Sequence, residues 1–93
     1  MKYSIEHTTQ FKKDFKQAER QGLNMDELKK VVLMLANGEA LPDEYKDHEL
    51  KGNYKGHREC HIEPDWLLIY KITESVLVLS LVRTGSHSRL FKK

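Results

Sequence analysis

The chain has 93 residues, of which 39% are hydrophobic and 32% are charged, and its formal net charge is +2. These values predict one small soluble domain, and no apolar run approaches the roughly 18 residues that a helix needs to span a bilayer. Cys60 is the only cysteine, which excludes an internal disulfide and indicates a reducing compartment. We therefore expect a cytoplasmic protein without a membrane partner.

The charged side chains are distributed unevenly along the chain. Residues 1–47 carry a net charge of −1, whereas residues 48–93 carry +3 and contain four of the five histidines. A basic surplus beside imidazoles suits a polyanionic ligand such as a nucleic acid. An excess of this size does not identify the ligand without further features.

The chain opens with a predicted strand and a predicted helix. Apolar and polar side chains alternate over residues 3–7, which indicates a short strand. The hydroxyl of Thr8 or Thr9 can cap the N-terminus of the helix that follows, and Gly22 is suited to end it. The apolar stripe of this helix consists of Phe11, Phe15 and Ala18.

A second helix is predicted after a connection of a few residues. It begins at Asn24, where Glu27 completes a capping-box pattern, and it ends at Gly38. Two amphipathic helices with a short connection are typical of an antiparallel pair that packs on one face of a sheet. The apolar stripe of the second helix consists of Leu28, Val31, Val32 and Leu35.

A long connection and a hairpin come next. Residues 41–56 are rich in charge and glycine, and a connection of this length in a small domain is more often functional or disordered than idle. Residues 57–62 and the nearly continuous apolar run 66–72 predict the two arms of a hairpin, the second arm buried on both faces of the sheet. Residues 63–65 supply the turn, because proline fixes φ and aspartate bonds its own backbone nearby.

The last part of the chain completes the predicted fold. A further strand is expected over residues 76–82, and residues 84–93 are expected to form a short polar tail. The order β-α-α-β-β-β predicts a single α+β domain over residues 1–93. Its two helices, both in the N-terminal half, would pack on one face of a mostly antiparallel four-stranded sheet. The opposite face of the sheet would be left for a ligand.

The first arm of the hairpin is dense in ionisable groups. Alternation along the strand places His57, Glu59 and His61 on one face and Arg58 and Cys60 on the other. Two imidazoles and a carboxylate at one end of a sheet are suited to a site on a rigid support. Cys60 itself is interpreted as a small hydrophobic residue of the strand.

Imidazoles and a carboxylate beside cations are suited to proton transfer at a phosphodiester without a metal. A base removes the proton from an RNA 2′-hydroxyl, an acid protonates the leaving 5′-oxygen, and cations stabilise the charge on the phosphoryl oxygens. Histidine can take either proton role near neutral pH. The candidate set consists of His48, His61, Asp65 and His87, with Lys46, Lys51, Arg58, Arg83 and Arg89 as cationic support.

The same side chains allow other roles. Three histidines and an aspartate could bind zinc, but the spacing contains no tight pair such as His-x₃-His, and three separate loops would have to converge. We therefore expect no metal ion and no cofactor. His7 and His57 are interpreted as solvated or hydrogen-bonded residues. Arg83 and Arg89 could be solvated, or could pair with an acidic partner.

Three blocks of sequence carry a family resemblance. They read DHELKG at residues 47–52, RECHIEPDWLLIY at residues 58–70 and RTGSHSRLF at residues 83–91. Together with the run FKKDF at residues 11–15, they resemble the YafQ branch of the RelE/ParE toxin superfamily over essentially the whole chain. The resemblance implies a RelE-like fold and the toxin half of a bacterial type II toxin–antitoxin pair. It also implies a ribosome-dependent endoribonuclease, an mRNA interferase, that cuts translated mRNA.

The resemblance also implies roles for individual residues. Phe91 matches the aromatic position that helps to place the substrate, and Arg83 matches a basic position near the active site. His87 is expected to exchange a proton with the reacting nucleotide, because a residue on a mobile tail can close over the substrate. The family's catalytic positions are matched by His48, His61, Asp65 and His87.

The resemblance implies partners as well. An acidic and partly disordered antitoxin would fold over the basic face of the toxin, and operator DNA would be contacted only through the antitoxin complex. One alternative is a superfamily member that poisons DNA gyrase, or that only binds its antitoxin and represses its operon. Another is a toxin-like domain that has lost activity. The retained histidines and aspartate favour the enzyme, because a pure binding protein has no need of them.

Overall fold

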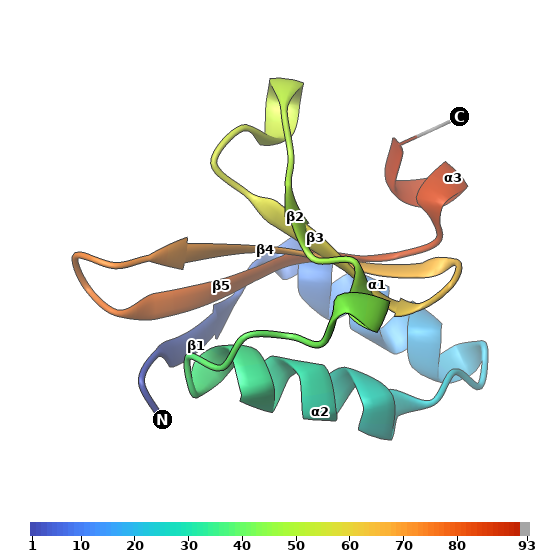
Figure 1. Cartoon of the computed structure of the whole chain (residues 1–93). Helices are drawn as coiled ribbons and strands as arrows, with labels where there is room; N and C mark the ends of the chain where they lie inside the picture. The colour runs from blue at the N-terminus through green and yellow to red at the C-terminus, as the bar shows by residue number, and fades with distance from the viewer. Residues whose placement is uncertain (92–93) are drawn as a thin grey trace.

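The computed structural model describes residues 1–91 of the chain (Figure 1). Lys92 and Lys93, which the predicted domain includes, lie outside the described residues. The elements in chain order are β1 (Ser4–His7), α1 (Thr9–Arg20), α2 (Met25–Ala36), the 3₁₀ turn η1 (Asp43–Tyr45), β2 (His48–Glu49), the 3₁₀ turn η2 (Gly52–Tyr54), β3 (Arg58–Glu63), β4 (Trp66–Thr73), β5 (Val78–Gly85) and α3 (His87–Phe91).

The predicted α+β class is confirmed, but the predicted sheet is wrong in detail. The sheet has five strands in the order β1-β5-β4-β3-β2, and β1 runs parallel to β5 while the other neighbours are antiparallel. The additional strand is β2, in which His48 pairs with Glu59 and Glu49 with Arg58. Two residues are too short to show a period-2 pattern, so this strand exists only through its pairing with β3.

The ends of the two long helices follow local rules. The Thr8 hydroxyl accepts a hydrogen bond from the Phe11 N–H at 2.9 Å, which confirms Thr8 as the N-cap of α1. Past the other end of α1, Gly22 has a φ of +74°, a conformation that costs glycine little. The capping box expected at α2 is absent: the Asn24 side chain makes no capping bond, and its carbonyl oxygen accepts the Glu27 N–H at 3.1 Å.

One face of the sheet packs against α1 and α2, which lie together below it in Figure 1. Burial of each large aliphatic or aromatic side chain in this core contributes about 1.5–3 kcal/mol. The helices contribute Phe11, Ala18, Leu28, Val31 and Leu35, and the strands contribute Cys60, Ile62, Trp66, Leu68, Tyr70, Leu79 and Leu81. Cys60 is therefore a buried core residue, as interpreted, and burial raises the pKa of its thiol to about 12.

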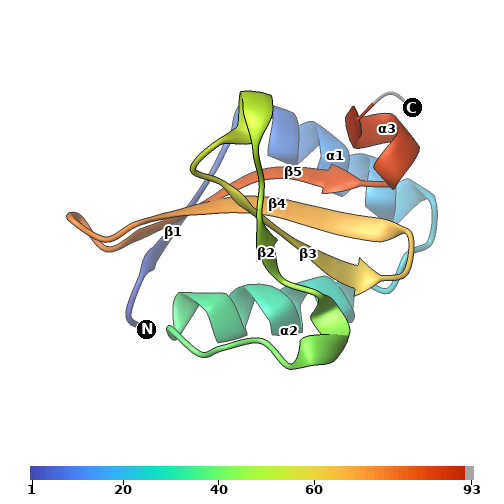
Figure 2. The same cartoon turned by 45° about the horizontal axis from the view of Figure 1, so that its top comes forward.

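The opposite face of the sheet carries a second, smaller cluster. Leu67 and Ile69 of β4 are fully buried there against Leu90, so β4 is covered on both faces, as its continuous apolar run predicts. The loop with η2 and the short helix α3 lie over this face, on the other side of the sheet from α1 and α2 (Figures 1 and 2). The cluster also includes Leu50, Tyr54, Val82 and Phe91.

The end of the chain differs from the expected polar tail. Residues 76 and 77 belong to the turn before β5, so this strand starts and ends later than predicted. Residues 87–91 form the helix α3, and the Ser86 hydroxyl caps it by accepting the Arg89 N–H at 3.2 Å. Leu90 is the apolar anchor of this helix and is only 6% exposed. His87 is therefore carried by an anchored helix and not by a mobile tail.

No helix in the described part of the chain has both the length and the apolar character that crossing a membrane requires.

Candidate active site

Two predicted site histidines flank a buried carboxylate on the open face of the sheet. The Nε2 atoms of His48 and His61 lie 3.5 Å and 3.7 Å from the same oxygen, Oε1 of Glu59. The Glu59 side chain is only 6% exposed, whereas that of His48 is 50% exposed. The pairing of His48 with Glu59 across β2 and β3 produces this contact. Protonation of either ring would turn the contact into an ion pair.

Backbone carbonyls hold both rings in one orientation. The Nδ1–H of His48 donates to the Lys46 carbonyl oxygen at 2.7 Å, and the Nδ1–H of His61 donates to the Pro64 carbonyl oxygen at 3.3 Å. A carbonyl oxygen can only accept, so each Nδ1 must carry its hydrogen. The neutral form of each ring then has its free electron pair on Nε2, the atom available to take a proton.

Asp65 connects the hairpin turn to the C-terminal helix. Its carboxylate oxygen Oδ1 accepts the backbone N–H of His87 at 3.1 Å, at the first residue of α3. A carboxylate at this place satisfies a free N–H of the helix and interacts favourably with the helix dipole. The His61 ring is hydrogen-bonded to the carbonyl oxygen of Pro64, which directly precedes Asp65. A series of contacts therefore connects His48 with His87.

Aromatic rings extend this line of contacts beyond His87. The centroids of the His87 and Phe91 rings lie 5.0 Å apart, and Phe91 meets Tyr54 edge-on at 6.0 Å. Tyr54 in turn meets His57 edge-on at 5.7 Å. Phe91, the last residue of α3, therefore packs against the loop that contains η2. Both α3 and this loop lie over the open face (Figure 2).

Arg83 and Arg89 meet at a buried carboxylate. Arg83 Nε donates to Asp14 Oδ2 at 2.8 Å, and Arg89 Nη2 donates to Asp14 Oδ1 at 3.2 Å. The hydrogen bond to Asp14 raises the pKa of Arg83, so this side chain stays charged. Of the two alternatives left open for these arginines, the acidic partner is the one present, and it belongs to the same chain.

The remaining candidate cations, Lys46 and Lys51, each lie near a histidine. Lys46 lines a pocket together with His61. Lys46 contributes its backbone carbonyl to His48, and its own side chain is exposed. Lys51 lines a pocket of about 530 Å³ together with Lys55 and His57. The structure thus brings His48, His61, Asp65, His87 and Phe91 into one line of contacts and leaves the two lysines at its border.

Arg58 has a structural role next to the site. Its guanidinium donates to Asp47 from Nε at 3.3 Å and from Nη2 at 3.2 Å, and the Tyr70 hydroxyl donates to the other Asp47 oxygen at 2.5 Å. Burial and this bond to Asp47 raise the pKa of Tyr70, which therefore remains a neutral donor. Asp47 directly precedes His48, so these bonds attach the start of β2 to the sheet.

Within residues 1–91, no group of three or more histidine, cysteine or acidic side chains is arranged to hold a metal ion.

The family model for the "bacterial toxin of type II toxin-antitoxin system, YafQ" matches residues 3–92 of the chain. The chain belongs to this family of toxins. The mRNA interferase toxin YafQ of Escherichia coli strain K12 is similar to it, with 46% identity over 88 residues, 94% of each sequence.

Solved YafQ structures share the fold of this family member. The crystal structure of YafQ from E. coli strain BL21(DE3) matches with a TM-score of 0.90 and 43% identity, and the match covers 96% of this chain and 98% of that chain. A chain of the crystal structure of the E. coli DinJ–YafQ complex matches with a TM-score of 0.88 and 44% identity, covering 96% and 98% of the two chains.

Three residues that contact the candidate side chains have no predicted role in the sequence of this YafQ-family chain. Strand alternation places Glu59 on the histidine face without assigning it a function, and Tyr54 lies in the connection over residues 41–56, where no period marks it. Asp14 is a charged residue on the buried stripe of α1, between Phe11 and Ala18. A charge at a position where the helical period demands an apolar side chain was a signal that could have identified it.

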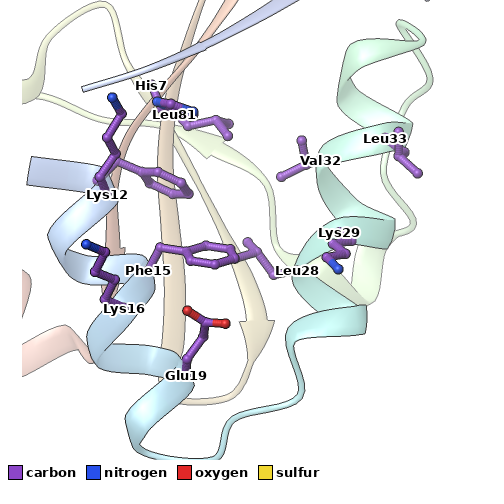
Figure 3. A pocket seen from close by; sticks show the side chains of 11 residues that line it. His7, Lys12, Phe15, Lys16, Glu19, Leu28, Lys29, Val32, Leu33 and Leu81 are labelled. Carbon is purple, nitrogen blue, oxygen red and sulfur yellow. The ribbon is translucent and has the colours of Figure 1, made fainter. Parts of the chain in front are cut away.

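A groove of this YafQ-family chain lies on the other side of the sheet, away from His48, His61 and His87. It has a volume of about 660 Å³ and is formed mainly by α1 and α2. Phe15 points across it towards Leu28, and the side chains of Lys12, Lys16 and Lys29 lie around it (Figure 3). The candidate proton-transfer residues do not line it, so its size does not mark the site of the chemistry.

Proposed function

We propose that this chain is the toxin of a type II toxin–antitoxin pair and cleaves mRNA on the ribosome. The observation that supports this function best is the line of contacts from His48 through Glu59 and His61 to Asp65 and His87. It combines the imidazoles of His48 and His61, whose Nδ1 atoms are hydrogen-bonded, with the Glu59 carboxylate between them and the Asp65 carboxylate that bonds the backbone of His87, on the face of the sheet that α1 and α2 leave free. The E. coli relative carries the name mRNA interferase toxin.

The proposed reaction uses the RNA's own 2′-hydroxyl. A base takes the 2′-hydroxyl proton while the 2′-oxygen attacks the neighbouring phosphorus. The bond from phosphorus to the 5′-oxygen breaks, and an acid gives that oxygen a proton. The products are a 2′,3′-cyclic phosphate and a free 5′-hydroxyl. No oxidant or cofactor is needed, because only a proton and a phosphoryl group move.

The geometry supports a division of roles among the candidate residues. His48 and His61 present Nε2 with Nδ1 already bonded, which suits them to accept a proton on one side of the phosphate. Glu59 would stabilise the imidazolium that forms. His87, exposed at the start of α3, would exchange a proton with the other oxygen, and Asp65 would hold the backbone of α3 in place.

Substrate binding is assigned to the aromatic and cationic side chains. Phe91 would stack on a base, an interaction worth about 1–3 kcal/mol. Arg83 and Arg89 would face the phosphoryl oxygens, and Lys46 and Lys51 would contact phosphates farther along the strand. Exposure of both lysines is consistent with such contacts.

The proposed partners follow from the family. We propose that residues 1–93 act as one cytoplasmic toxin domain that a cognate acidic antitoxin neutralises. Operator DNA would be contacted only through that complex. The crystal structure of the E. coli DinJ–YafQ complex contains such a pair for the relative.

The test is cleavage of a defined message in a translating bacterial extract. The purified protein is added, and the 5′ ends of the message are mapped by primer extension, with ribosome-free RNA of the same sequence as a comparison. A His87→Ala variant removes the proposed proton donor or acceptor. A Ser88→Ala variant changes the next exposed residue of α3 and serves as the matched control.

Cleavage at defined positions of translated message, present with Ser88→Ala and lost with His87→Ala, would support the proposed function. An intact message beside unimpaired translation would contradict it. In that case inhibition of gyrase would be the next activity to measure.

A further inference from the structure

A buried carboxylate lies beneath the cationic side of the candidate site. The Asp14 side chain on α1 has no exposed surface. Its two oxygens accept hydrogen bonds from Arg83 Nε at 2.8 Å, Arg83 Nη2 at 3.3 Å, Gln10 Nε2 at 3.1 Å, the Thr84 N–H at 3.2 Å and Arg89 Nη2 at 3.2 Å. Every donor but Gln10 comes from β5 or α3.

This network determines where two cations of the site can lie. A buried carboxylate is tolerated only when it is fully paired, and here two guanidinium groups pair with one carboxylate. Without Asp14, the two positive charges would repel each other and would have no anion on their buried side. Arg83 uses Nε and Nη2 towards Asp14, so its Nη1 group is directed elsewhere.

The same network connects α1 to the helix that carries the chemistry. Arg89 lies in α3 between His87 and Phe91, and its bond to Asp14 fixes α3 from the α1 side. The bond between Asp65 and the His87 N–H fixes the start of α3 from the hairpin side. Leu90, buried between them, fills the space under the helix. Asp14 is thus one of the two carboxylates that set the position of α3.

We propose that Asp14 is a positioning residue for RNA cleavage, which acts through Arg83 and Arg89 and never touches the substrate. It holds Arg83 against β5 with Nη1 directed away from Asp14, and it holds α3 so that His87 and Phe91 keep their places. This inference rests on the proposed function, because it assigns Asp14 a role in that same reaction.

The test is the single-turnover rate constant for cleavage of ribosome-bound message with the protein in excess. Asp14→Asn keeps the shape of the side chain but removes its charge and turns one acceptor into a donor that faces guanidinium groups. We expect the rate constant to fall about 10²-fold, as for a misplacement of catalytic groups by roughly 1 Å. Glu19→Gln removes the same charge from an exposed position of α1 and should leave the rate constant unchanged.

A purely structural role would give a different result. A partial loss of folded protein lowers the unfolding temperature, but at a saturating excess of protein it leaves the single-turnover rate constant unchanged, because the folded protein still exceeds the message. A double-mutant cycle adds a second criterion. Because Asp14 acts through both arginines, Asp14→Asn should slow the Arg83→Ala variant by a smaller factor than it slows the wild type, whereas independent effects would multiply.

A second variant tests the role of Asp14 if Asp14→Asn does not fold. Arg89→Met removes one cation from Asp14 and leaves the pair with Arg83 intact. Because Arg89 is also proposed to face the phosphate, Arg89→Met should lower both the rate constant and, by about one, the slope of log affinity against log salt. A folded Arg89→Met variant that cleaves at the wild-type rate constant would overturn a role of Asp14 that acts through Arg89.

The outcomes separate this inference from the proposed function. Wild-type protein that cleaves the message, beside folded Asp14→Asn protein that cleaves it at the same rate constant, would overturn the inference alone. Wild-type protein that leaves translated message intact would overturn both. A slow Asp14→Asn variant with unchanged Glu19→Gln would support the role of Asp14.

Discussion

At the scale of single residues, the ring nitrogens of the sheet histidines have fixed partners. A backbone carbonyl occupies Nδ1 in both His48 and His61, and the Glu59 carboxylate faces both Nε2 atoms. A ring held in one tautomer needs no reorganisation before it accepts a proton, which is an advantage for general base catalysis. His87 has no such carbonyl partner among the bonds of the described residues, and it is attached through its backbone.

His87→Ala should separate chemistry from stability. His87 is exposed, and its backbone bond to Asp65 survives the substitution, so we expect the free energy of unfolding to change by less than about 1 kcal/mol. Loss of one proton-transfer group should lower the cleavage rate about 10²–10⁴-fold. Urea unfolding and message cleavage measure the two quantities. A variant that lost stability in proportion to its activity would refute the assigned role.

At the scale of elements, short segments are held in place by a few specific contacts. The strand β2 has two residues, and it stays on the sheet through its pairing with β3 and through Asp47, which precedes it. The helix α3 has five residues and depends on Asp65, Asp14 and the buried Leu90. Neither segment would be stable by itself, because an isolated turn of helix or a lone strand pair is marginal in water.

Asp47→Asn should weaken the attachment of β2. It removes the charge that accepts bonds from Arg58 and from the buried Tyr70 hydroxyl, and we expect a loss of about 1–3 kcal/mol in the free energy of unfolding. Cleavage should also slow, because His48 follows Asp47 directly. Tyr70→Phe keeps the pair between Asp47 and Arg58 and is the matched control for activity. Equal cleavage rates for wild type and Asp47→Asn would show that this anchor does not position His48.

Leu77→Asn should stabilise the protein. Leu77 has a φ of +52° in the turn before β5 and is 45% exposed, so it occupies a left-handed conformation without burying its side chain fully. Asparagine tolerates that conformation better, and we expect a gain of up to about 1 kcal/mol. The midpoint of urea unfolding measures it. Val76→Asn changes an exposed neighbour without a positive φ and should bring no such gain. An equal gain would mean that the effect comes from replacing an exposed apolar side chain and not from the backbone conformation.

At the scale of the whole molecule, the sheet separates two different surfaces. One face holds the main core and the groove lined by α1 and α2, and α3 and the loop with η2 lie over the other face (Figures 1 and 2). His48 and His61 meet Glu59 on that second face. Asp14 connects the two sides, because it belongs to α1 and binds arginines of β5 and α3. Its ionisation should therefore influence the stability of the entire fold.

The contribution of Asp14 to the free energy of unfolding should disappear at acid pH. Burial raises the pKa of Asp14, but the hydrogen bonds from Arg83, Gln10 and the Thr84 N–H outweigh it, so the pKa lies below its ordinary value of 3.8. A lowered pKa in the folded state stabilises the protein above the pKa of the unfolded chain, and this stabilisation disappears as the pH falls through the lower, folded value. Breaking a buried pair costs up to about 3–5 kcal/mol, which is the largest loss expected for Asp14→Asn at pH 7.

Urea unfolding of wild type and Asp14→Asn from pH 7 down to pH 3 measures this linkage. The two free energies of unfolding should differ by a constant amount near neutral pH and approach each other in acid, below the ordinary pKa of aspartate. A difference that stays constant over the whole range would mean that the charge of Asp14 does not stabilise the fold.

Features that depend on residues a few positions apart could be predicted from the amino-acid sequence. Thr8 caps α1, the apolar stripes define both long helices, and the run from Trp66 onward forms a strand buried on both faces. Side-chain chemistry made His48, His61, Asp65 and His87 the candidates, and the motif blocks then identified the family, whose catalytic positions these residues match. These signals are local, since helical and strand periods and capping hydrogen bonds involve residues only a few positions apart.

Other features depend on contacts between residues far apart in the sequence, and only the folded structure shows them. The strand β2 forms because His48 pairs with Glu59. The helix α3 is stabilised because Leu90 packs against β4 and the Asp65 carboxylate accepts the first N–H of the helix. Asp14 meets Arg83 and Arg89 across more than two thirds of the chain. Burial and charge in the folded state determine such contacts, and no periodic pattern in the sequence predicts them.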